Sequence, residues 1–160
     1  ARTAMYYPAT GIIGELRTID IGVGYTLPFE LIGAKWINSE ELAEELNSRN
    51  LEGVYFRPMY YTPYYFAHKK EHLQGVQIHI LDFEKFQPVK SQIHILAALK
   101  NLYPEQKIFN EKRNTMFDKV SGSDKLRKYI KEGKKAEDII QEWQDKKNQF
   151  KKMSRKYYLY

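Results

Sequence analysis

The stretch that decides the predicted fold is residues 53–82, GVYFRPMYYTPYYFAHKKEHLQGVQIHILD. Apolar and polar residues alternate with a period of two over residues 54–57 and again over 76–80, as in strands with one buried face. We expect two neighbouring strands of one sheet. The apolar set that would then face the core is Val54, Phe56, Val76, Ile78 and Ile80.

The opposite face of these strands would carry Tyr55, Arg57, Gln77 and His79, which is an unusual set for plain solvent exposure. The connection between the strands is long and holds the aromatic run YYTPYYF at residues 60–66. Connections longer than about 12 residues without structure of their own tend to be functional or disordered, and this one is too aromatic for disorder. It therefore predicts the lip of a binding cleft.

The rest of the chain predicts helices more than strands. We expect a strand over residues 5–7, a glycine-punctuated loop over 12–26 and a short helix over 29–34 that begins after Pro28. A capping box at residues 38–41 predicts a helix that extends to about residue 50. The most apolar helix begins at Pro88 and ends before Pro104.

After residue 104 the pattern is less regular until the C-terminal part. Residues 121–124 would cap a short helix, and apolar residues from Ala136 to Tyr157 then keep a spacing of three to four, which predicts a long amphipathic helix. We expect the aromatic end, residues 157–160, to dock on the body of the protein. The fold class is therefore predicted as α+β: a small mixed β-sheet packed with several helices, in a single domain over residues 1–160.

Composition excludes several classes of site. The chain has no cysteine, so disulfides, thiolate metal sites and thiol nucleophiles are excluded, and no apolar run is long enough to predict a membrane span. The net charge of +6 lies in one region: residues 1–123 hold 14 basic and 14 acidic residues, and residues 124–160 hold 12 and 6. These lysines alternate with acids on an amphipathic helix and accompany no nucleic-acid motif, so we expect a solvated face and no nucleic-acid partner.

One short string matches a metal-binding pattern. Residues 68–72, HKKEH, fit the inverted zinc-protease motif, which needs both histidines on one ordered helix, a third ligand and a water-facing glutamate. The string lies between an aromatic loop and a predicted strand, which leaves no room for a long helix. We therefore expect a solvated loop tip and no metal site, with a zinc peptidase as an alternative that metal content would settle.

The carboxylates beside glycine-rich or strand-end backbone are Glu15, Asp20, Glu30 and Asp82. Glycosidic cleavage commonly uses an acid and a second carboxylate, so each is a candidate. Glu30 would stay ionised near a helix start, but the pattern favours a first-turn glutamate that only stabilises the helix end. His94 lies within the apolar helix, which favours packing over catalysis.

Several ordered strings together resemble the NamZ-type exo-β-N-acetylmuramidase family, as its C-terminal domain only. They cover almost the whole chain and are YPATG at residues 7–11, GYTLPFELIGA at 24–34, WI at 36–37, FRP at 56–58, YTP at 61–63, GVQIH at 75–79, FQPV at 86–89 and RKYYLY at 155–160. Many members of the family carry an arginine where this chain has Val23 and another where it has Leu27.

The resemblance implies a glycoside hydrolase that releases N-acetylmuramic acid from the non-reducing ends of peptidoglycan fragments. It also implies a larger two-domain enzyme with an N-terminal Rossmann-like domain, a cleft between the domains and the principal catalytic acid outside this chain. The implied partners are a peptidoglycan-derived saccharide and that N-terminal catalytic domain. The implied location is extracytoplasmic, and no cofactor is implied.

With such a ligand, Arg57 would hold the lactyl carboxylate of muramic acid in a forked ion pair. Tyr25 and Tyr61 would stack on the sugar or its acetamido group, and Thr26 and His79 would donate hydrogen bonds. Glu30 is the catalytic candidate within this chain and would orient a hydroxyl group. His79 has an alternative role as a hydrogen-bonded histidine of the sheet. The alternative function is a non-catalytic module that binds an anionic cell-wall polymer through the basic C-terminal helix.

Overall fold

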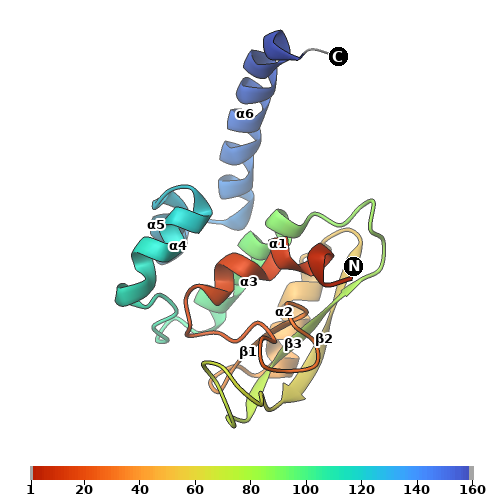
Figure 1. Cartoon of the computed structure of the whole chain (residues 1–160), viewed down its shortest axis with the longest axis vertical. Coiled ribbons are helices and arrows are strands. Elements are labelled where there is room, and N and C mark those ends of the chain that lie inside the picture. The colour runs from red at the N-terminus through yellow and green to blue at the C-terminus, as the bar shows by residue number, and fades with distance from the viewer. Residues whose placement is uncertain (1, 159–160) are drawn as a thin grey trace.

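The computed structural model describes residues 2–158 and contains one three-stranded sheet with helices on one side of it (Figure 1). The elements in chain order are α1 (Arg2–Gly14), β1 (Leu31–Ala34), α2 (Ser39–Ser48), β2 (Val54–Tyr61), β3 (Leu73–Ile80), α3 (Pro88–Leu102), the 3-10 turn η1 (Glu111–Arg113), α4 (Asn114–Ser121), α5 (Lys125–Lys131), α6 (Ala136–Ser154) and the 3-10 turn η2 (Arg155–Tyr157). The predicted α+β class is confirmed.

The sheet has the order β1-β3-β2, and both pairings are antiparallel, so it is not the mixed sheet expected from the sequence. The prediction that residues 54–57 and 76–80 are neighbouring strands is confirmed. Arg57 lies opposite Gln77 and Tyr55 opposite His79, as the alternation of side chains required. The long connection between β2 and β3 is the loop of an extended hairpin, which makes this pair antiparallel.

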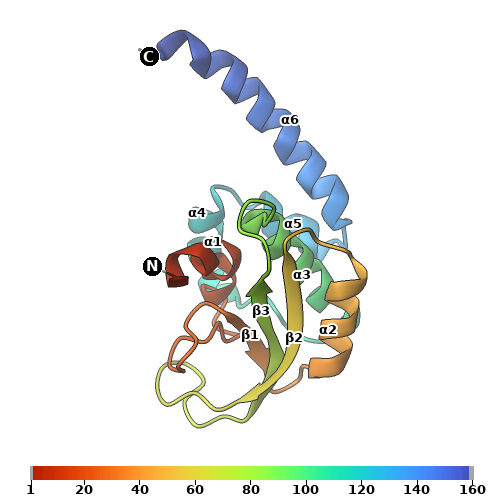
Figure 2. The same cartoon turned by 90° about the vertical axis from the view of Figure 1, so that its right-hand side faces the viewer.

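One face of the sheet carries the main core. Phe56, Val76 and Ile78 are buried there beneath α2 and α3. Helix α3 lies against α1 as well as α2, and every residue from 91 to 99 is buried, as its apolar sequence predicted (Figure 2). Helix α2 confirms the predicted cap, because the Asn38 side chain accepts hydrogen bonds from the backbone N–H groups of Glu40 and Glu41.

Two short elements near the N-terminus were predicted wrongly. Residues 5–7 form part of α1 instead of a strand, because Tyr6, Ala9 and Ile13 recur at helical spacing and are all buried, and α1 packs on α3. Pro8 lies inside this helix, so its position misled the prediction. Residues 29–34 do not form a helix.

The chain turns at Phe29, which has a φ of 69°, and then runs as β1 beside β3. Pairing with residues 40 to 46 positions further along the chain decides this segment, since Leu31 and Ile32 both become buried there.

The long C-terminal helix is confirmed, but only its beginning is packed. Ala136 and Ile139 are buried, Ile140 and Trp143 lie partly against the core, and the rest of α6 projects away from the body (Figure 1). The expected docking of the aromatic end is wrong for Tyr157 and Tyr158, whose exposed fractions are 69% and 62%. The other two residues of that predicted hook, Leu159 and Tyr160, lie outside the described residues.

A polar cluster fixes the base of α6 to α5. The Glu142 carboxylate accepts hydrogen bonds from Tyr129 Oη at 2.8 Å, Lys134 Nζ at 3.3 Å and Lys146 Nζ at 2.7 Å. These donors, Lys146 first, lower the pKa of Glu142 to about 2. The orientation of the projecting helix therefore depends on one carboxylate together with a small apolar contact.

Candidate functional site

Two loops gather beyond one end of the sheet (Figure 2). We name residues 17–30 the glycine loop and residues 62–72 the aromatic loop. The Tyr64 N–H donates to the Gly24 carbonyl at 2.6 Å, and the Arg17 guanidinium lies 4.1 Å from the centroid of the Phe66 ring. Gly24 has a φ of 99°, and a Cβ there would lie 2.2 Å from the Tyr65 carbonyl oxygen, so only glycine permits this approach. The two loops form one structural unit.

Backbone strain is concentrated in this unit. Five described residues other than glycine have a positive φ, and four of them lie in the two loops: Arg17, Phe29, Phe66 and Lys70. Such conformations cost about 1 to 3 kcal/mol each and persist only where the surrounding structure enforces them, which is typical of ligand-binding sites. The strained backbone therefore indicates that the two loops are a candidate functional site.

A cavity of about 250 Å³ lies between these loops and α1. We name it cavity A. Its lining includes Tyr7 from α1, Glu15 just after α1, Arg17 and Asp20 from the glycine loop, and Phe66 and His68 from the aromatic loop. Two carboxylates, a guanidinium, an imidazole and aromatic rings thus surround one small space, which is the usual composition of a polar ligand site.

Asp20 is the most unusual group in cavity A. It is 3% exposed, and its Oδ1 accepts hydrogen bonds from Gly22 N–H at 2.7 Å and from Tyr61 Oη at 2.9 Å. Burial raises the pKa of Asp20, against the lowering effect of these two donors. Its backbone also pairs with Gly33 of β1, so the sheet fixes its position. A fixed carboxyl group with a raised pKa beside a cavity is suited to hold or donate a proton.

Tyr61 supports Asp20 from the sheet. Its burial and the nearby Asp20 charge raise the pKa of the Tyr61 phenol, which therefore remains a hydrogen-bond donor. The ring lies across Gly33, where a Cβ would come within 2.4 Å of the phenol oxygen. Tyr61 thus acts through Asp20 and is 5% exposed, so it offers little surface to a sugar.

The histidines of the zinc-like string do not converge on a metal position. Their segment is not helical: His68 Nδ1 lies 2.9 Å from Glu71 Oε2, and His72 Nδ1 lies 3.0 Å from Thr62 Oγ1. The contact with His68 is the main cause that lowers the pKa of Glu71, with Lys35 as a second partner. Within residues 2–158 no group of three histidine or carboxylate side chains is placed to bind a metal ion.

A second polar arrangement lies on the outer face of the sheet. Arg57 Nη2 donates to Gln77 Oε1 at 2.7 Å, and Gln77 Nε2 donates to Glu30 Oε2 at 3.4 Å. Gln77 and Glu30 are buried, whereas Arg57 is exposed. Arg57 therefore presents its remaining donors to solvent while two buried side chains orient it. Glu30 lies just before β1 and not at a helix start, so the predicted electrostatic reason for its ionisation does not apply.

The six residues predicted as a site divide into separate groups, and none of them lines cavity A. Glu30 and Arg57 belong to the chain of side chains on the sheet, and Tyr61 contacts Asp20. Tyr25 lies 5.3 Å from the Tyr61 ring and is stacked at 6.4 Å on Tyr64, which is exposed. Thr26 is exposed on the glycine loop, and His79 is partly buried in β3. Their roles stay predictions.

Sequence reasoning gave the residues of cavity A too little weight. Asp20 is only one of four candidate carboxylates, Phe66 belongs to the aromatic run predicted as the lip of a cleft, and Arg17 is not among the predicted residues. The available signal was the order Asp20-x-Gly22-x-Gly24, in which a carboxylate precedes two glycines and can accept the N–H groups of the turn. His68 belongs to the zinc-like string, for which the sequence predicts a solvated loop tip and no ligand.

None of the helices within the described residues is long and apolar enough to cross a membrane. His94 is a packed histidine, as predicted: it is 2% exposed, its Nδ1 lies 3.2 Å from Arg49 Nη1, and burial lowers its pKa.

This arrangement of sheet, helices and loops occurs in a known class of protein. A crystal structure of a DUF1343 family protein from Bacteroides fragilis NCTC 9343 matches with a TM-score of 0.89 and 43% sequence identity. The match covers 98% of this chain and 42% of that chain. At this identity and coverage the chain has the fold of one part of a DUF1343 protein.

The family can be stated more narrowly. The family model for the C-terminal domain of the exo-β-N-acetylmuramidase NamZ matches residues 5–160, and the chain belongs to this family of C-terminal domains. The peptidoglycan β-N-acetylmuramidase NamZ of Bacillus subtilis (strain 168) is 41% identical over 154 residues. That alignment covers 96% of this chain and 36% of the relative, so the chain spans well under half the length of the proteins it matches. The resemblance stated from the sequence is confirmed.

Proposed function

We propose that this chain is the C-terminal domain of an exo-acting glycoside hydrolase that releases N-acetylmuramic acid from the non-reducing ends of peptidoglycan fragments. In this proposal the glycine loop, the aromatic loop and the outer sheet face form one wall of a cleft. An N-terminal catalytic domain of the same protein forms the other wall and supplies the principal acid. Membership of the family and the printed name of the relative from B. subtilis support the substrate class.

The observation that carries the proposal is cavity A with its buried carboxyl group between two strained loops. Because burial raises the pKa of Asp20, its carboxyl group keeps a proton to higher pH than an exposed aspartate does. It can then donate a hydrogen bond to a sugar hydroxyl or acetamido oxygen. A proton held at this position serves substrate binding, while proton transfer to the leaving oxygen remains with the other domain.

Arg57 is the proposed contact for the lactyl carboxylate of muramic acid. A guanidinium offers two parallel N–H donors to a carboxylate, and the bond from Arg57 to Gln77 uses one terminal nitrogen and fixes the plane of the group. Glu30 holds Gln77 in turn, which gives Glu30 a positioning role. In this proposal the exposed ring of Tyr64 stacks on the sugar. The Tyr25 ring lies nearly parallel behind it and supports it.

Exposed aromatic side chains surround this region and support a partner domain there. Tyr7, Tyr64, Tyr65 and Phe66 are each between 48% and 69% exposed, and a concentration of exposed apolar side chains is typical of an interaction surface. We propose that the N-terminal domain covers part of this surface. A role in cell-wall recycling and an extracytoplasmic location follow from the proposed substrate.

The test uses the longer protein that contains this chain and a chromogenic muramyl glycoside as substrate. Replacing Arg57 with alanine should lower kcat/KM about 10- to 100-fold, because one charge-assisted, bidentate contact is lost. Replacing Lys119, an exposed residue of α4, with alanine is the matched loss of one positive charge and should leave kcat/KM unchanged.

A glucosaminyl glycoside without the lactyl group gives the second control. Loss of Arg57 should barely change its turnover, because there is no carboxylate to bind. Equal losses on both substrates, or full activity of Arg57→Ala on the muramyl glycoside, would remove Arg57 from the proposed site.

A further inference from the structure

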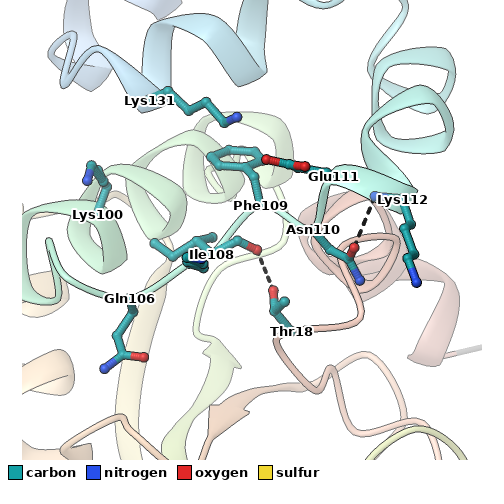
Figure 3. Close-up of a pocket in the computed structure, with 10 residues that line it drawn as sticks. Thr18, Lys100, Gln106, Ile108, Phe109, Asn110, Glu111, Lys112 and Lys131 are labelled. Atoms are coloured by element: carbon teal, nitrogen blue, oxygen red, sulfur yellow. Dashed lines mark hydrogen bonds between the residues drawn. The ribbon is translucent and has the colours of Figure 1, made fainter.

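A second cavity, of about 590 Å³, lies apart from the proposed sugar site. We name it cavity B. Its floor is Ile108 and Phe109, and residues 106–112 form most of its wall (Figure 3). Lys100 near the end of α3 and Lys131 at the end of α5 complete it, and Lys100, Lys131 and Lys112 lie on different sides of Phe109 in this view (Figure 3). Three separate elements thus build one open, basic cavity.

A single segment separates the two cavities. Arg17 and Ile19 line cavity A, and Thr18 between them lines cavity B and donates its hydroxyl hydrogen to the Ile108 carbonyl. Arg113 reinforces the partition, because it is paired with Glu15 of cavity A. A ligand in cavity B would therefore lie beside the proposed sugar site without entering it.

The charge of cavity B is strongly one-sided. Four lysines line it, namely Lys100, Lys107, Lys112 and Lys131, against the single carboxylate of Glu111. Among the described residues, none of these lysines has a carboxylate within 4.0 Å, whereas Lys125, Lys134 and Lys146 all pair with Glu142. Like charges around one cavity repel each other in the free protein. An anion bound there would reduce this electrostatic repulsion, which favours binding.

The kinds of residue present narrow the anion. The cavity has lysines and no arginine, so an anion there is bound by point charges, as lysine binds phosphate, and not by a bidentate fork. Its one aromatic ring, Phe109, is 9% exposed, so no platform exists for stacking nucleic-acid bases. The Asn110 and Gln106 amides and the Glu111 carboxylate can bind hydroxyl groups between the phosphates.

We propose that cavity B binds an extended polyanion in which phosphodiester groups alternate with hydroxyl-bearing polyol units. The lysines are separated around a large cavity, which favours several spaced charges over one compact ion. The site is independent of the glycosidase function proposed above, since the two cavities share no lining residue. It replaces the basic face of α6 as the position where an anionic polymer would bind.

Calorimetric titration of the 160-residue chain with a glycerol-phosphate oligomer tests this inference. The double variant Lys107→Gln/Lys112→Gln should bind about tenfold more weakly than the wild type, and the wild-type affinity should fall as salt is added. Neither side chain takes part in a hydrogen bond or ion pair within the described structure, so folding should be unaffected, which melting temperature checks. Lys119→Gln/Lys152→Gln removes the same charge elsewhere and should change the affinity less than about twofold.

The comparison ligands separate the possible results. Inorganic phosphate should bind far more weakly than the oligomer, and a single-stranded DNA oligonucleotide should bind more weakly as well. Equal weakening in both double variants would show a general charge effect and overturn the site. DNA that binds as tightly as the oligomer would overturn the proposed specificity for polyol units. Inorganic phosphate that binds as tightly would overturn the proposal that the ligand is extended. No detectable binding of the oligomer would overturn the whole inference.

Discussion

The two faces of the three-stranded sheet differ in what they bury. The face covered by α2 and α3 buries Phe56, Val76 and Ile78 in the main core, whereas the outer face buries a small cluster of Leu31, Tyr61 and Leu73. Between these, the outer face holds polar pairs such as Arg57 with Gln77. Under the proposed function, the main stabilising core and the proposed binding residues therefore lie on opposite faces of one sheet. Substitutions on the two faces should therefore have different consequences.

The largest effect on stability is expected on the helix-covered face. Replacing Phe56 with alanine removes a fully buried ring and should lower the free energy of unfolding by about 3 to 5 kcal/mol. Urea denaturation measures this loss. Activity per folded molecule of the longer protein should be retained. A loss below about 1 kcal/mol would mean that this face is not the main source of stability.

The next effect concerns the Tyr61–Asp20 pair on the outer face. Tyr61→Phe keeps the ring but removes the donor to Asp20 Oδ1, and a buried group that loses a partner costs about 1 to 3 kcal/mol. Turnover should fall together with stability, because Asp20 loses its support from the sheet. Leu73→Ala, in the same small cluster, is the matched control: it should lower stability with little effect on turnover at saturating substrate. Equal turnover in both variants would show that the Tyr61–Asp20 hydrogen bond has no role in activity.

A smaller and pH-dependent effect is expected for Asp20→Asn. The folded-state pKa of Asp20 lies above its ordinary value of 3.8, so the folded protein binds a proton more tightly than the unfolded chain. Stability from this carboxyl group is then fully present below pH 3.8 and is lost as pH rises through the raised pKa. The asparagine variant should therefore gain stability relative to wild type as pH rises above 3.8 and through the raised pKa of Asp20, measured by urea midpoints. Parallel curves over this range would contradict the raised pKa.

The smallest effect is expected far from the sheet, at the base of α6. The pKa of Glu142 is lowered from 4.5 to about 2, so its contribution to stability is present above pH 4.5 and is lost as pH falls toward 2. Glu142→Gln should slightly lower the melting temperature at neutral pH, and the difference should vanish in this acid range. High salt should also reduce it, because the cluster is partly exposed. A difference in melting temperature that persists in acid would show that Glu142 stabilises the protein through packing and not through its charge.

The sequence predicted those elements whose pattern is local. The period of two over residues 54–57 and 76–80, the Asn38 cap and the apolar run of α3 each contain enough information within one segment. Helix α1 and strand β1 were missed because distant partners decide them: α1 is buried by α3, and β1 pairs with β3. Short apolar segments near proline and glycine do not specify one structure alone.

The same reason limits prediction of the site. The shared sheet face of Arg57 and Gln77 followed from strand periodicity and is confirmed. The contact between Asp20 and Tyr61 joins residues 41 positions apart, and the strained backbone at Phe29 and Phe66 has no sequence signature, since neither residue favours a positive φ. In cavity B, Lys107 and Lys112 share one segment, and Lys100 and Lys131 join them only through the packing of α3 with α5.

Gly33 and Gly75 face each other across the pairing of β1 with β3, and the Tyr61 ring occupies the room above Gly33. The missing side chain is therefore an essential part of the molecule, because it leaves the groove in which the tyrosine lies. A single methyl group added at Gly33 would push the Tyr61 ring aside and weaken its hydrogen bond to Asp20, although neither partner of that bond is itself substituted. The absence of a side chain at Gly33 thus preserves one of the hydrogen bonds that lower the pKa of the neighbouring Asp20 carboxyl group against the effect of burial.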